Sequence, residues 1–324
     1  MSPARSASFT VVVVNYGSHH LLRSTLTATL AADPSARAVV VDNFSGAAER
    51  AALQALADEH GWAVEMPATN LGFGGGMNVG VARALVDGAT RVLLLNPDAV
   101  VLPGGIAALG AAIDADPMTL AAPVIVRPDG SSFSSGTTDL SLLDGTMRAT
   151  RRRASGSTTP VLEWLSGACL ALTGELWAAT GGFDERYFLY WEDVDLSLRV
   201  QRAGGSLTVV ESAQAVHDEG ATHDDATNGD PSASRAKSAT YYYFNIRNRL
   251  LFAALHLDAR HVRRWVLTAP RAARAVVLQG GRRQLVRSTA PWTAAVRGTW
   301  DGLVLVVRER GVLVRGRRGV RTRG

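Results

Sequence analysis

Strands and helices that alternate near the start of the chain limit its fold more than any other feature. Residues 9–14, FTVVVV, are apolar at successive positions, which is typical of a parallel strand buried on both faces. Turn residues at 15–17 end this strand, and a helix is expected over 18–32. A second strand, AVVVDN at 38–43, again leads into an amphipathic helix. This order predicts a βαβ arrangement and a mostly parallel sheet.

Polar residues follow both of these strands at the points where the strands end. Asn15 and Tyr16 end the first strand, and Asp42 and Asn43 end the second. Ligands of such sheets bind at the carboxyl ends of the strands, so these residues are candidates for one nucleotide pocket. From spacing alone, a simple Asx turn at Asp42 and Asn43 explains the pattern equally well.

A glycine-rich stretch, ATNLGFGGGMNVGVARAL, is expected to form a loop before a helix that ends near Val86. A loop of this kind at a helix N-terminus is suited to bind a phosphate. It is not a dinucleotide-binding motif, because Met77 occupies the third glycine position of G-x-G-x-x-G. No Gly-Lys-Ser/Thr follows, which excludes a P-loop.

Two further strands end at residues that are suited to bind a metal ion. The strand expected over 91–101 breaks at Asn96-Pro97-Asp98, so Asp98 projects from a strand end. His217 follows a strand expected over 206–212. Taken alone, each is more often an ordinary turn or surface residue than a ligand.

The most distinctive stretch is GGFDERYFLYWEDVDLSLRVQRAG at 181–204, in which a helix is expected to begin near Glu192. Acids in its first turn and arginines in its last turn match the helix macrodipole, which is a purely structural explanation. The aromatic residues before the acids favour a different explanation, a carboxylate at the mouth of an aromatic-lined cleft. One of the acids is therefore a candidate general base for a bound hydroxyl.

Residues 181–199 resemble the acceptor-side motif of family 2 inverting glycosyltransferases, in particular the rhamnosyltransferase-like branch. VVVNYGS, VDNFSG, the N-x-G-F element and NPD resemble the other motifs of that family in the same order. The resemblance implies an α/β fold of the GT-A type, Rossmann-like with flanking helices, over residues 1–235. A basic helical region is expected over 236–324.

The resemblance also implies roles for individual residues. Asp193 falls at the position of the general base, and Glu192 is expected to contact the acceptor or shape the site. The residues implied on the donor side are Asn15, Tyr16, Asp42, Asn43, Asn70, Gly72, Phe73, Asn78, Asn96 and Asp98. Those implied on the acceptor side are Trp164, Gly167, Tyr190 and Trp191.

Related transferases hold Mg²⁺ or Mn²⁺ against the donor diphosphate through a D-x-D motif. Asn96 replaces the first acid here, so Asp98 is the only carboxylate that the motif supplies. The family carries a metal-binding histidine at the place of His217, and we expect this residue to complete the site. An imidazole ligand suits Mn²⁺ better than Mg²⁺, and ligation by neutral imidazole implies lower activity at acidic pH. His223 is the neighbouring histidine against which this assignment is tested.

The implied reaction is a single displacement at the anomeric carbon of a nucleoside diphosphate sugar. The branch resembled most transfers L-rhamnose from dTDP-rhamnose to a lipid-linked cell-wall acceptor. These motifs do not fix the sugar, so a UDP-sugar donor and a glycan acceptor remain alternatives. A nucleotidyltransferase is disfavoured, because residues 11–20 lack the expected G-x-G-T/S-R pattern with a lysine.

Charge is unevenly distributed along the chain. Residues 259–324 contain 16 arginines, no lysine and two acids, a balance of +14 in a chain whose total is +5. Trp265, Trp292 and Trp300 lie among these arginines, a pattern that predicts attachment to an anionic membrane surface on the cytoplasmic side. A basic cap against the acidic catalytic domain is the alternative. A nucleic-acid-binding protein is the weaker alternative, and no nucleic-acid partner is expected.

The remaining segments carry fewer constraints. Cys169 is the single cysteine, which excludes an intrachain disulfide and a thiolate zinc site and fits a buried strand in a reducing cytosol. Neither a signal peptide nor a membrane-spanning segment is expected. Residues 127–160 are expected to form a hairpin and a mobile loop. The arginines at 151–153 suit a solvated loop or, less favourably, a phosphate contact.

Overall fold

The computed structural model describes residues 8–218 and 237–320, which form two compact units. Within these limits the first unit comprises residues 8–138, 149–151 and 163–218. The second comprises 139–148, 152–162 and 237–320.

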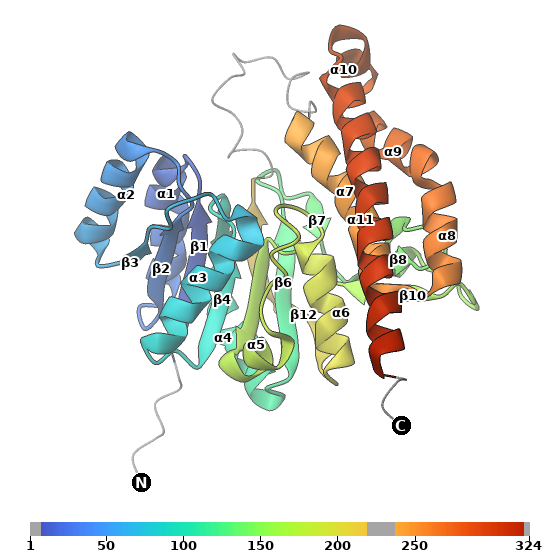
Figure 1. Ribbon diagram of the computed structural model, residues 1–324. Helices are drawn as coiled ribbons and strands as arrows, with labels where there is room; N and C mark the ends of the chain where they lie inside the picture. Colours follow the sequence, from blue (N-terminus) through green and yellow to red (C-terminus); the bar gives the residue numbers. More distant parts are fainter. Residues whose placement is uncertain (1–7, 219–236, 321–324) are drawn as a thin grey trace. The chain divides into compact units, whose positions relative to one another are not determined.

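A nine-stranded sheet forms the centre of the first unit, with eight strands in the order β3-β2-β1-β4-β11-β6-β12-β5 and β7 paired to β6 (Figure 1). Its strands are β1 (Phe9–Asn15), β2 (Arg37–Asp42), β3 (Ala63–Glu65), β4 (Arg91–Leu95), β5 (Ala99–Val101), β6 (Thr119–Val126), β7 (Ser132–Ser134), β11 (Cys169–Thr173) and β12 (Ser206–His217). Strands β1 to β4 are parallel to their neighbours in this group, whereas β11 is antiparallel to β4. The predicted mostly parallel sheet is confirmed.

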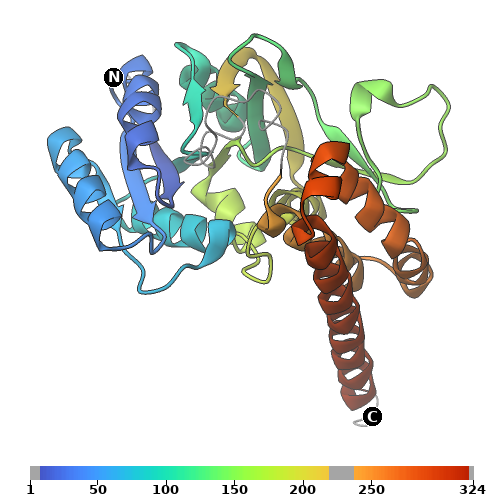
Figure 2. The same cartoon turned by 90° about the horizontal axis from the view of Figure 1, so that it is seen from above.

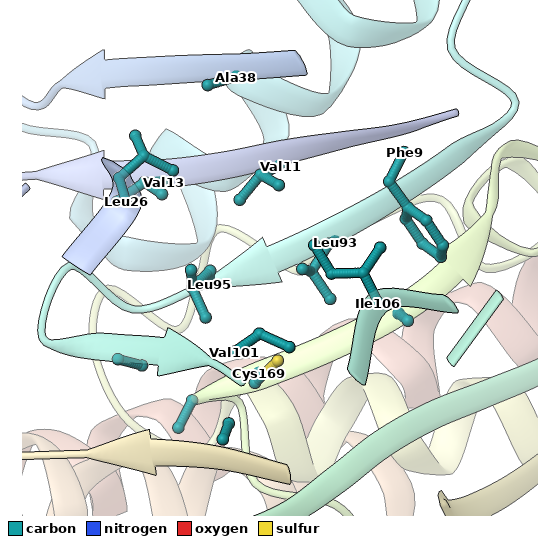
Figure 3. Packing of buried hydrophobic residues seen from close by; sticks show 14 of the residues in the cluster. Phe9, Val11, Val13, Leu26, Ala38, Leu93, Leu95, Val101, Ile106 and Cys169 are labelled. Atoms are coloured by element: carbon teal, nitrogen blue, oxygen red, sulfur yellow. The ribbon is translucent and has the colours of Figure 1, made fainter. Parts of the chain in front are cut away.

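Helices flank this sheet, and apolar side chains fill the space on both of its faces. The helices are α1 (His19–Ala32), α2 (Ala47–His60), α3 (Gly72–Val86), α4 (Gly105–Ala115), α5 (Gly174–Thr180) and α6 (Glu192–Arg202). Val11 and Val13 of β1 pack into one cluster with Leu93 (Figure 3), and Val12 and Val14 pack into the other. Successive residues of a strand point to opposite faces, which explains why FTVVVV is apolar at every position.

The glycine-rich stretch differs from its prediction, because its glycines lie inside α3 rather than in a loop before it. A Cβ atom on Gly80 would lie 2.4 Å from Val12 Cγ1, and one on Gly76 would lie 3.0 Å from both methyl carbons of Val14. These glycines therefore allow α3 to approach the central strand closely. The predicted loop was wrong, and close packing of the helix on the sheet accounts for these two glycines. Phosphate binding at this stretch stays a prediction.

Residues 127–160 contain more strand than the predicted hairpin and loop. A three-stranded sheet has the order β10-β8-β9, and β7 extends the large sheet. The added elements are β8 (Thr138–Ser141), β9 (Met147–Ala149), a short 3-10 helix (Thr150–Arg152) and β10 (Val161–Trp164). His217 is the last residue of β12 rather than a residue beyond the strand. Cys169 is buried at the start of β11, as predicted, and burial raises the pKa of its thiol to about 12.

Helices make up most of the second unit, as predicted for the basic C-terminal region. They are α7 (Ala239–His256), α8 (Ala259–Leu267), α9 (Ala269–Leu278), α10 (Arg282–Arg287) and α11 (Ala290–Val320). Figure 2 shows α11 as a long rod, and α11 packs along α7. A Cβ atom on Gly298 would lie 2.6 Å from the carbonyl oxygen of Tyr243, so this glycine permits the close approach of α11 to α7. Of the helices described, none has the length and apolar character needed to cross a membrane.

Candidate active site

A sharp turn of the backbone places the acidic start of α6. Tyr190 and Trp191 both have positive φ angles, 65° and 75°, a conformation that bulky residues rarely adopt. Strain of this kind persists only where the surrounding structure enforces it, and it is concentrated at functional sites. The turn ends at Glu192, so both acids of the Glu192-Asp193 pair lie in the first turn of the helix.

Asp193 is held by two backbone donors and remains partly accessible to solvent. Its Oδ2 accepts a hydrogen bond from the Gly167 amide at 3.0 Å, and its Oδ1 accepts one from the Val194 amide at 2.8 Å. Burial nevertheless raises the pKa of Asp193 to about 6. Such a carboxylate is mostly ionised at neutral pH and is basic enough to accept a proton during catalysis.

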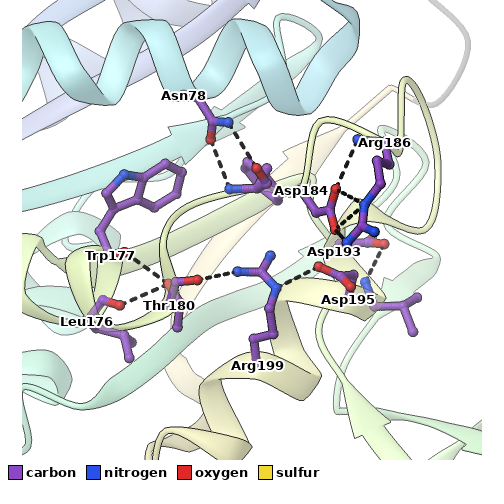
Figure 4. Close-up of polar contacts among 11 residues, drawn as sticks. Asn78, Leu176, Trp177, Thr180, Asp184, Arg186, Asp193, Asp195 and Arg199 are labelled. Carbon is purple, nitrogen blue, oxygen red and sulfur yellow. Dashed lines mark hydrogen bonds and ion pairs between the residues drawn. The ribbon is translucent and has the colours of Figure 1, made fainter. Parts of the chain in front are cut away.

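Glu192 and Asp195 lie in the same helical turn but in different environments. Burial, and secondarily the charge of Asp193, raises the pKa of Glu192 well above its ordinary value, and its Oε2 has no hydrogen-bond partner among the described residues. Asp195 is fully buried, and its Oδ2 accepts a hydrogen bond from Arg199 at 2.7 Å (Figure 4). Arg199 also donates to the carbonyl oxygen of Thr180. Asp195 is therefore a structural ion-pair partner, whereas Glu192 and Asp193 share a site.

The segment before β11 joins Asp193 to the Asn96-Pro97-Asp98 turn. Gly167 donates its amide to Asp193, and the next residue, Ala168, accepts a hydrogen bond from the Asn96 amide at 3.0 Å. A Cβ atom on Gly167 would lie 3.2 Å from Cβ of Asp193, so a larger residue would displace the carboxylate. The candidate base and the candidate metal-binding turn thus lie at the same edge of the sheet.

Asp98 and His217 are brought together, as the sequence predicted. Asp98 Oδ1 and His217 Nε2 are 3.1 Å apart, and the two residues are only 7% and 6% exposed. Their contact lacks the directionality of a hydrogen bond, so Asp98 Oδ1 is left unsatisfied within the described structure. The side-chain nitrogen of Asn96 lies 3.4 Å from the same imidazole nitrogen.

This pair suits a divalent cation. Adjacent ligands of an octahedral ion with bonds of about 2.1 Å are about 3.0 Å apart, close to the observed separation of Asp98 Oδ1 and His217 Nε2. No cluster of three or more His, Cys, Asp or Glu side chains suited to a metal occurs in residues 8–218 and 237–320. The described protein residues would therefore supply two ligands, with the remainder left to substrate or water. His223 lies outside the described residues.

Several of the residues predicted to bind the donor have protein partners. Asn15 is buried, donates to Glu49 at 3.0 Å and accepts two hydrogen bonds from Ser18. Asp42 is also buried, pairs with Arg50 at 2.7 Å and accepts a hydrogen bond from the Ser45 hydroxyl. In contrast, the Tyr16 side chain is exposed at the end of β1. The predicted donor contacts of these residues remain predictions.

Other predicted donor-side residues fix the segments around the start of α3. The side-chain amide of Asn43 donates to Asn70 at 3.0 Å and to the carbonyl oxygen of Gly72 at 2.8 Å. Asn78 forms paired hydrogen bonds with the backbone of Phe183, each of 2.9 Å (Figure 4). Position 72 requires glycine, because a Cβ atom there would lie 2.1 Å from the carbonyl oxygen of Phe188.

Aromatic residues complete the surroundings of the site. Phe73 packs edge to face against Phe183, with ring centroids 6.0 Å apart. The indole nitrogen of Trp164 is buried without a hydrogen-bond partner in the described part of the chain. Phe133 contacts the His217 ring edge to face at 4.9 Å and was not predicted. No local pattern marked Phe133, because it lies in a serine-rich segment that resembles a solvated loop.

Comparison with known proteins matches this chain to a family. The family model described as glycosyltransferase like family 2 matches residues 5–268. An N-acetylglucosaminyl-diphospho-decaprenol L-rhamnosyltransferase of Mycobacterium tuberculosis is 33% identical over 233 residues, which cover 64% of this chain and 75% of that protein. Rhamnosyltransferase WbbL of Escherichia coli K12 is 37% identical over 57 residues, or 18% of this chain and 22% of that protein.

Solved structures show the same fold at low sequence identity. GalNAc-T7 with UDP, GalNAc and Mn²⁺ gives a TM-score of 0.56 at 17% identity, covering 82% of this chain and 55% of that one. Mannosyltransferase PcManGT from Pyrobaculum calidifontis with GDP-Man and Mn²⁺ gives 0.50 at 16% identity, covering 94% and 86%. These similarities support the predicted GT-A fold.

Proposed function

The chain belongs to glycosyltransferase family 2, and we propose that it is an inverting, metal-dependent transferase that moves L-rhamnose from dTDP-rhamnose to a hydroxyl of a lipid-linked acceptor. The proposed chemistry rests on one observation: the carboxylate of Asp193 is partly accessible, and its pKa is raised to about 6. The choice of sugar and acceptor rests on the name of the mycobacterial relative.

Asp193 acts as the general base. Its carboxylate accepts the proton of the acceptor hydroxyl as the hydroxyl oxygen bonds to the anomeric carbon of the donor. The bond from that carbon to the nucleoside diphosphate breaks on the opposite face, so the configuration inverts. Amides of Gly167 and Val194 hold the two carboxylate oxygens in place, which limits the reorganisation needed during the transfer.

Glu192 and the Asp98–His217 pair support this reaction in different ways. Glu192 is buried, and its raised pKa favours the neutral form, so it adds no second negative charge beside Asp193. Asp98 and His217 would hold a divalent cation, which when bound would offset negative charge on the donor diphosphate. GalNAc-T7 and PcManGT, two proteins with this fold, were solved with Mn²⁺, which supports a cation here.

We also propose that the second unit attaches the enzyme to the inner face of the cell membrane. One side of α11 packs against α7 through small residues, among them Gly298 and Gly302. Its exposed side carries large apolar residues at helical spacing, namely Trp292, Val296, Trp300, Val304 and Val307. Tryptophans suit the membrane interface, and the arginine excess of this region is complementary to anionic lipids.

Turnover by two matched variants tests the catalytic assignment. Asp193→Asn should lower kcat by about two orders of magnitude or more, as expected for a lost general base, while dTDP-rhamnose still binds with similar affinity. Glu192→Gln, which keeps a neutral side chain at the adjacent position, should do less harm. A near-normal kcat for Asp193→Asn would remove Asp193 from the role of base. A panel of dTDP-, UDP- and GDP-sugars in Mn²⁺ tests the donor separately.

A further inference from the structure

A cavity of about 340 Å³ in the second unit is lined largely by arginine and hydroxyl side chains. The β8–β9 hairpin, the following loop and α8 contribute to its walls. The charged residues that line it are Arg148, Arg152, Arg153, Arg264, Asp139 and Asp144, and the hydroxyl-bearing ones are Ser141, Thr146, Ser157 and Thr159. This volume lies within the range typical of small-molecule sites.

The arginines of this arginine pocket are only partly compensated by acids. Arg153 forms a two-pronged pair with Asp139, with nitrogen–oxygen distances of 2.8 and 2.5 Å. For Arg148, Arg152 and Arg264, no carboxylate partner occurs within the described part of the chain. Three guanidinium groups in one cavity therefore retain their hydrogen-bond donors for an anionic ligand.

Buried contacts fix the hairpin wall of the pocket to the helices. The indole of Trp265 donates to the carbonyl oxygen of Leu142 at 2.8 Å, and the Arg249 guanidinium lies 4.6 Å from the centre of the Trp265 ring. Arg249 also donates to the carbonyl oxygen of Asp144 at 2.6 Å. Arg264 is the neighbour of Trp265 on α8, so the same contacts set its place beside the hairpin. These contacts fix the place of the hairpin beside α8, whereas the side chains of Arg148, Arg152 and Arg264 are exposed and accessible to a ligand.

We propose that the arginine pocket binds the diphosphate group of the lipid-linked acceptor, an inference that rests on the proposed function. Guanidinium groups bind phosphate oxygens through two parallel hydrogen bonds, and a diphosphate offers enough oxygens for several arginines. The hydroxyl groups in the wall supply further donors. Strand β10 contributes Val161 to the pocket and ends at Trp164, a residue implied on the acceptor side.

Direct binding of a soluble prenyl diphosphate, farnesyl diphosphate, tests this inference without requiring transfer. Titration calorimetry with the full chain in EDTA should show binding that Arg152→Gln and Arg264→Gln each weaken by roughly tenfold or more. The matched control is Arg263→Gln, an exposed arginine of α8 that does not line the pocket, and it should leave the affinity unchanged. Affinity for dTDP in Mn²⁺ should be unchanged in all three variants.

Two further probes separate the acceptor diphosphate from other phosphate sources. Inorganic phosphate should compete only weakly with farnesyl diphosphate, and vesicles containing phosphatidylglycerol should bind without dependence on Arg152 or Arg264. The inference is overturned if the two variants bind farnesyl diphosphate like the unaltered chain, or if vesicle binding depends on these arginines as strongly as diphosphate binding does. The unaltered chain could bind farnesyl diphosphate and yet transfer no sugar. If the two variants then lose this binding, the pocket is supported and only the proposed function is rejected.

Discussion

Replacing Asp193 by asparagine should change the stability of the fold in opposite directions at pH 8 and pH 4. Burial raises the pKa of Asp193 to about 6, whereas aspartate in an unfolded chain titrates near 3.9. A carboxyl group whose pKa rises on folding favours the folded state below its unfolded pKa, and this contribution is lost as the pH rises through the folded value. The cost of the ionised carboxylate is therefore full at pH 8 and small at pH 4. The asparagine variant carries this cost at neither pH.

The magnitude follows from two opposing terms. A shift of about two pKa units corresponds to about 3 kcal/mol, which partial solvent exposure of the side chain reduces to about 2 kcal/mol. Against this, asparagine has one acceptor oxygen for the two amides of Gly167 and Val194, and the lost hydrogen bond costs about 1 kcal/mol. The variant should thus be more stable than the unaltered chain by about 1 kcal/mol at pH 8, and slightly less stable at pH 4.

Thermal unfolding in EDTA without donor, measured from pH 4 to pH 8, detects this crossing as a few degrees in Tm. Asp184→Asn is the matched control with the opposite sign. Burial opposes ionisation of Asp184, but hydrogen bonds from Arg186 outweigh it and lower its pKa below the ordinary value. That variant should be less stable than the unaltered chain at pH 8 and should keep most of this difference at pH 4, because the lowered pKa leaves Asp184 ionised in the folded state over this range. A Tm difference for Asp193→Asn that is the same at both pH values would refute the reasoning.

Three further predictions concern activity and membrane binding. The value of kcat at saturating substrates should fall as the pH decreases through about 6, because Asp193 must be ionised to accept a proton, and a profile that stays flat to pH 5 would contradict this. His217→Ala should raise the Mn²⁺ concentration for half-maximal activity by about tenfold or more, whereas His223→Ala should not. The reverse result would show that His223, and not His217, binds the metal. Flotation should show binding to anionic but not neutral vesicles, weakened when Trp292 and Trp300 are replaced by serine; equal binding to both vesicle types, or to neither, would contradict a membrane role.

Much of the fold could be predicted, because its determinants lie within short segments. Strand β1 is buried on both faces and is apolar throughout, and the turn after β4 begins where Asn96-Pro97 interrupts a hydrophobic run. The start of α3 could not be read in this way. Whether Gly76 and Gly80 form a loop or a helix depends on Val14 and Val12 in the strand beneath, and a local sequence pattern contains no such information.

The candidate site could likewise be predicted only in part. The resemblance to the family paired Asp98 with His217, and the structure brings the two residues together. The end of β12 pairs antiparallel with the start of β5, so His217 lies opposite Ala99, the residue after Asp98. The sequence did not show that Asn43 and Asn78 use their side chains on the protein backbone, because an amide suits a ligand and a carbonyl group equally well. Only the packing of α3 against the segment before α6 decides between these partners for Asn78.

The three acids of the first turn of α6 show why position in a helix does not by itself assign a role. The macrodipole favours ionised carboxylates at a helix N-terminus, and this acts on all three residues alike. Asp195 has the partner that a structural acid requires, because Arg199 lies 2.7 Å away. Glu192 and Asp193 have no such cation among the residues that the structure describes, and burial raises the pKa of both in spite of the dipole. Two neighbouring acids are thus kept at a cost to stability, one favouring the neutral form and one titrating near 6, and this arrangement suits the proton transfer that we propose.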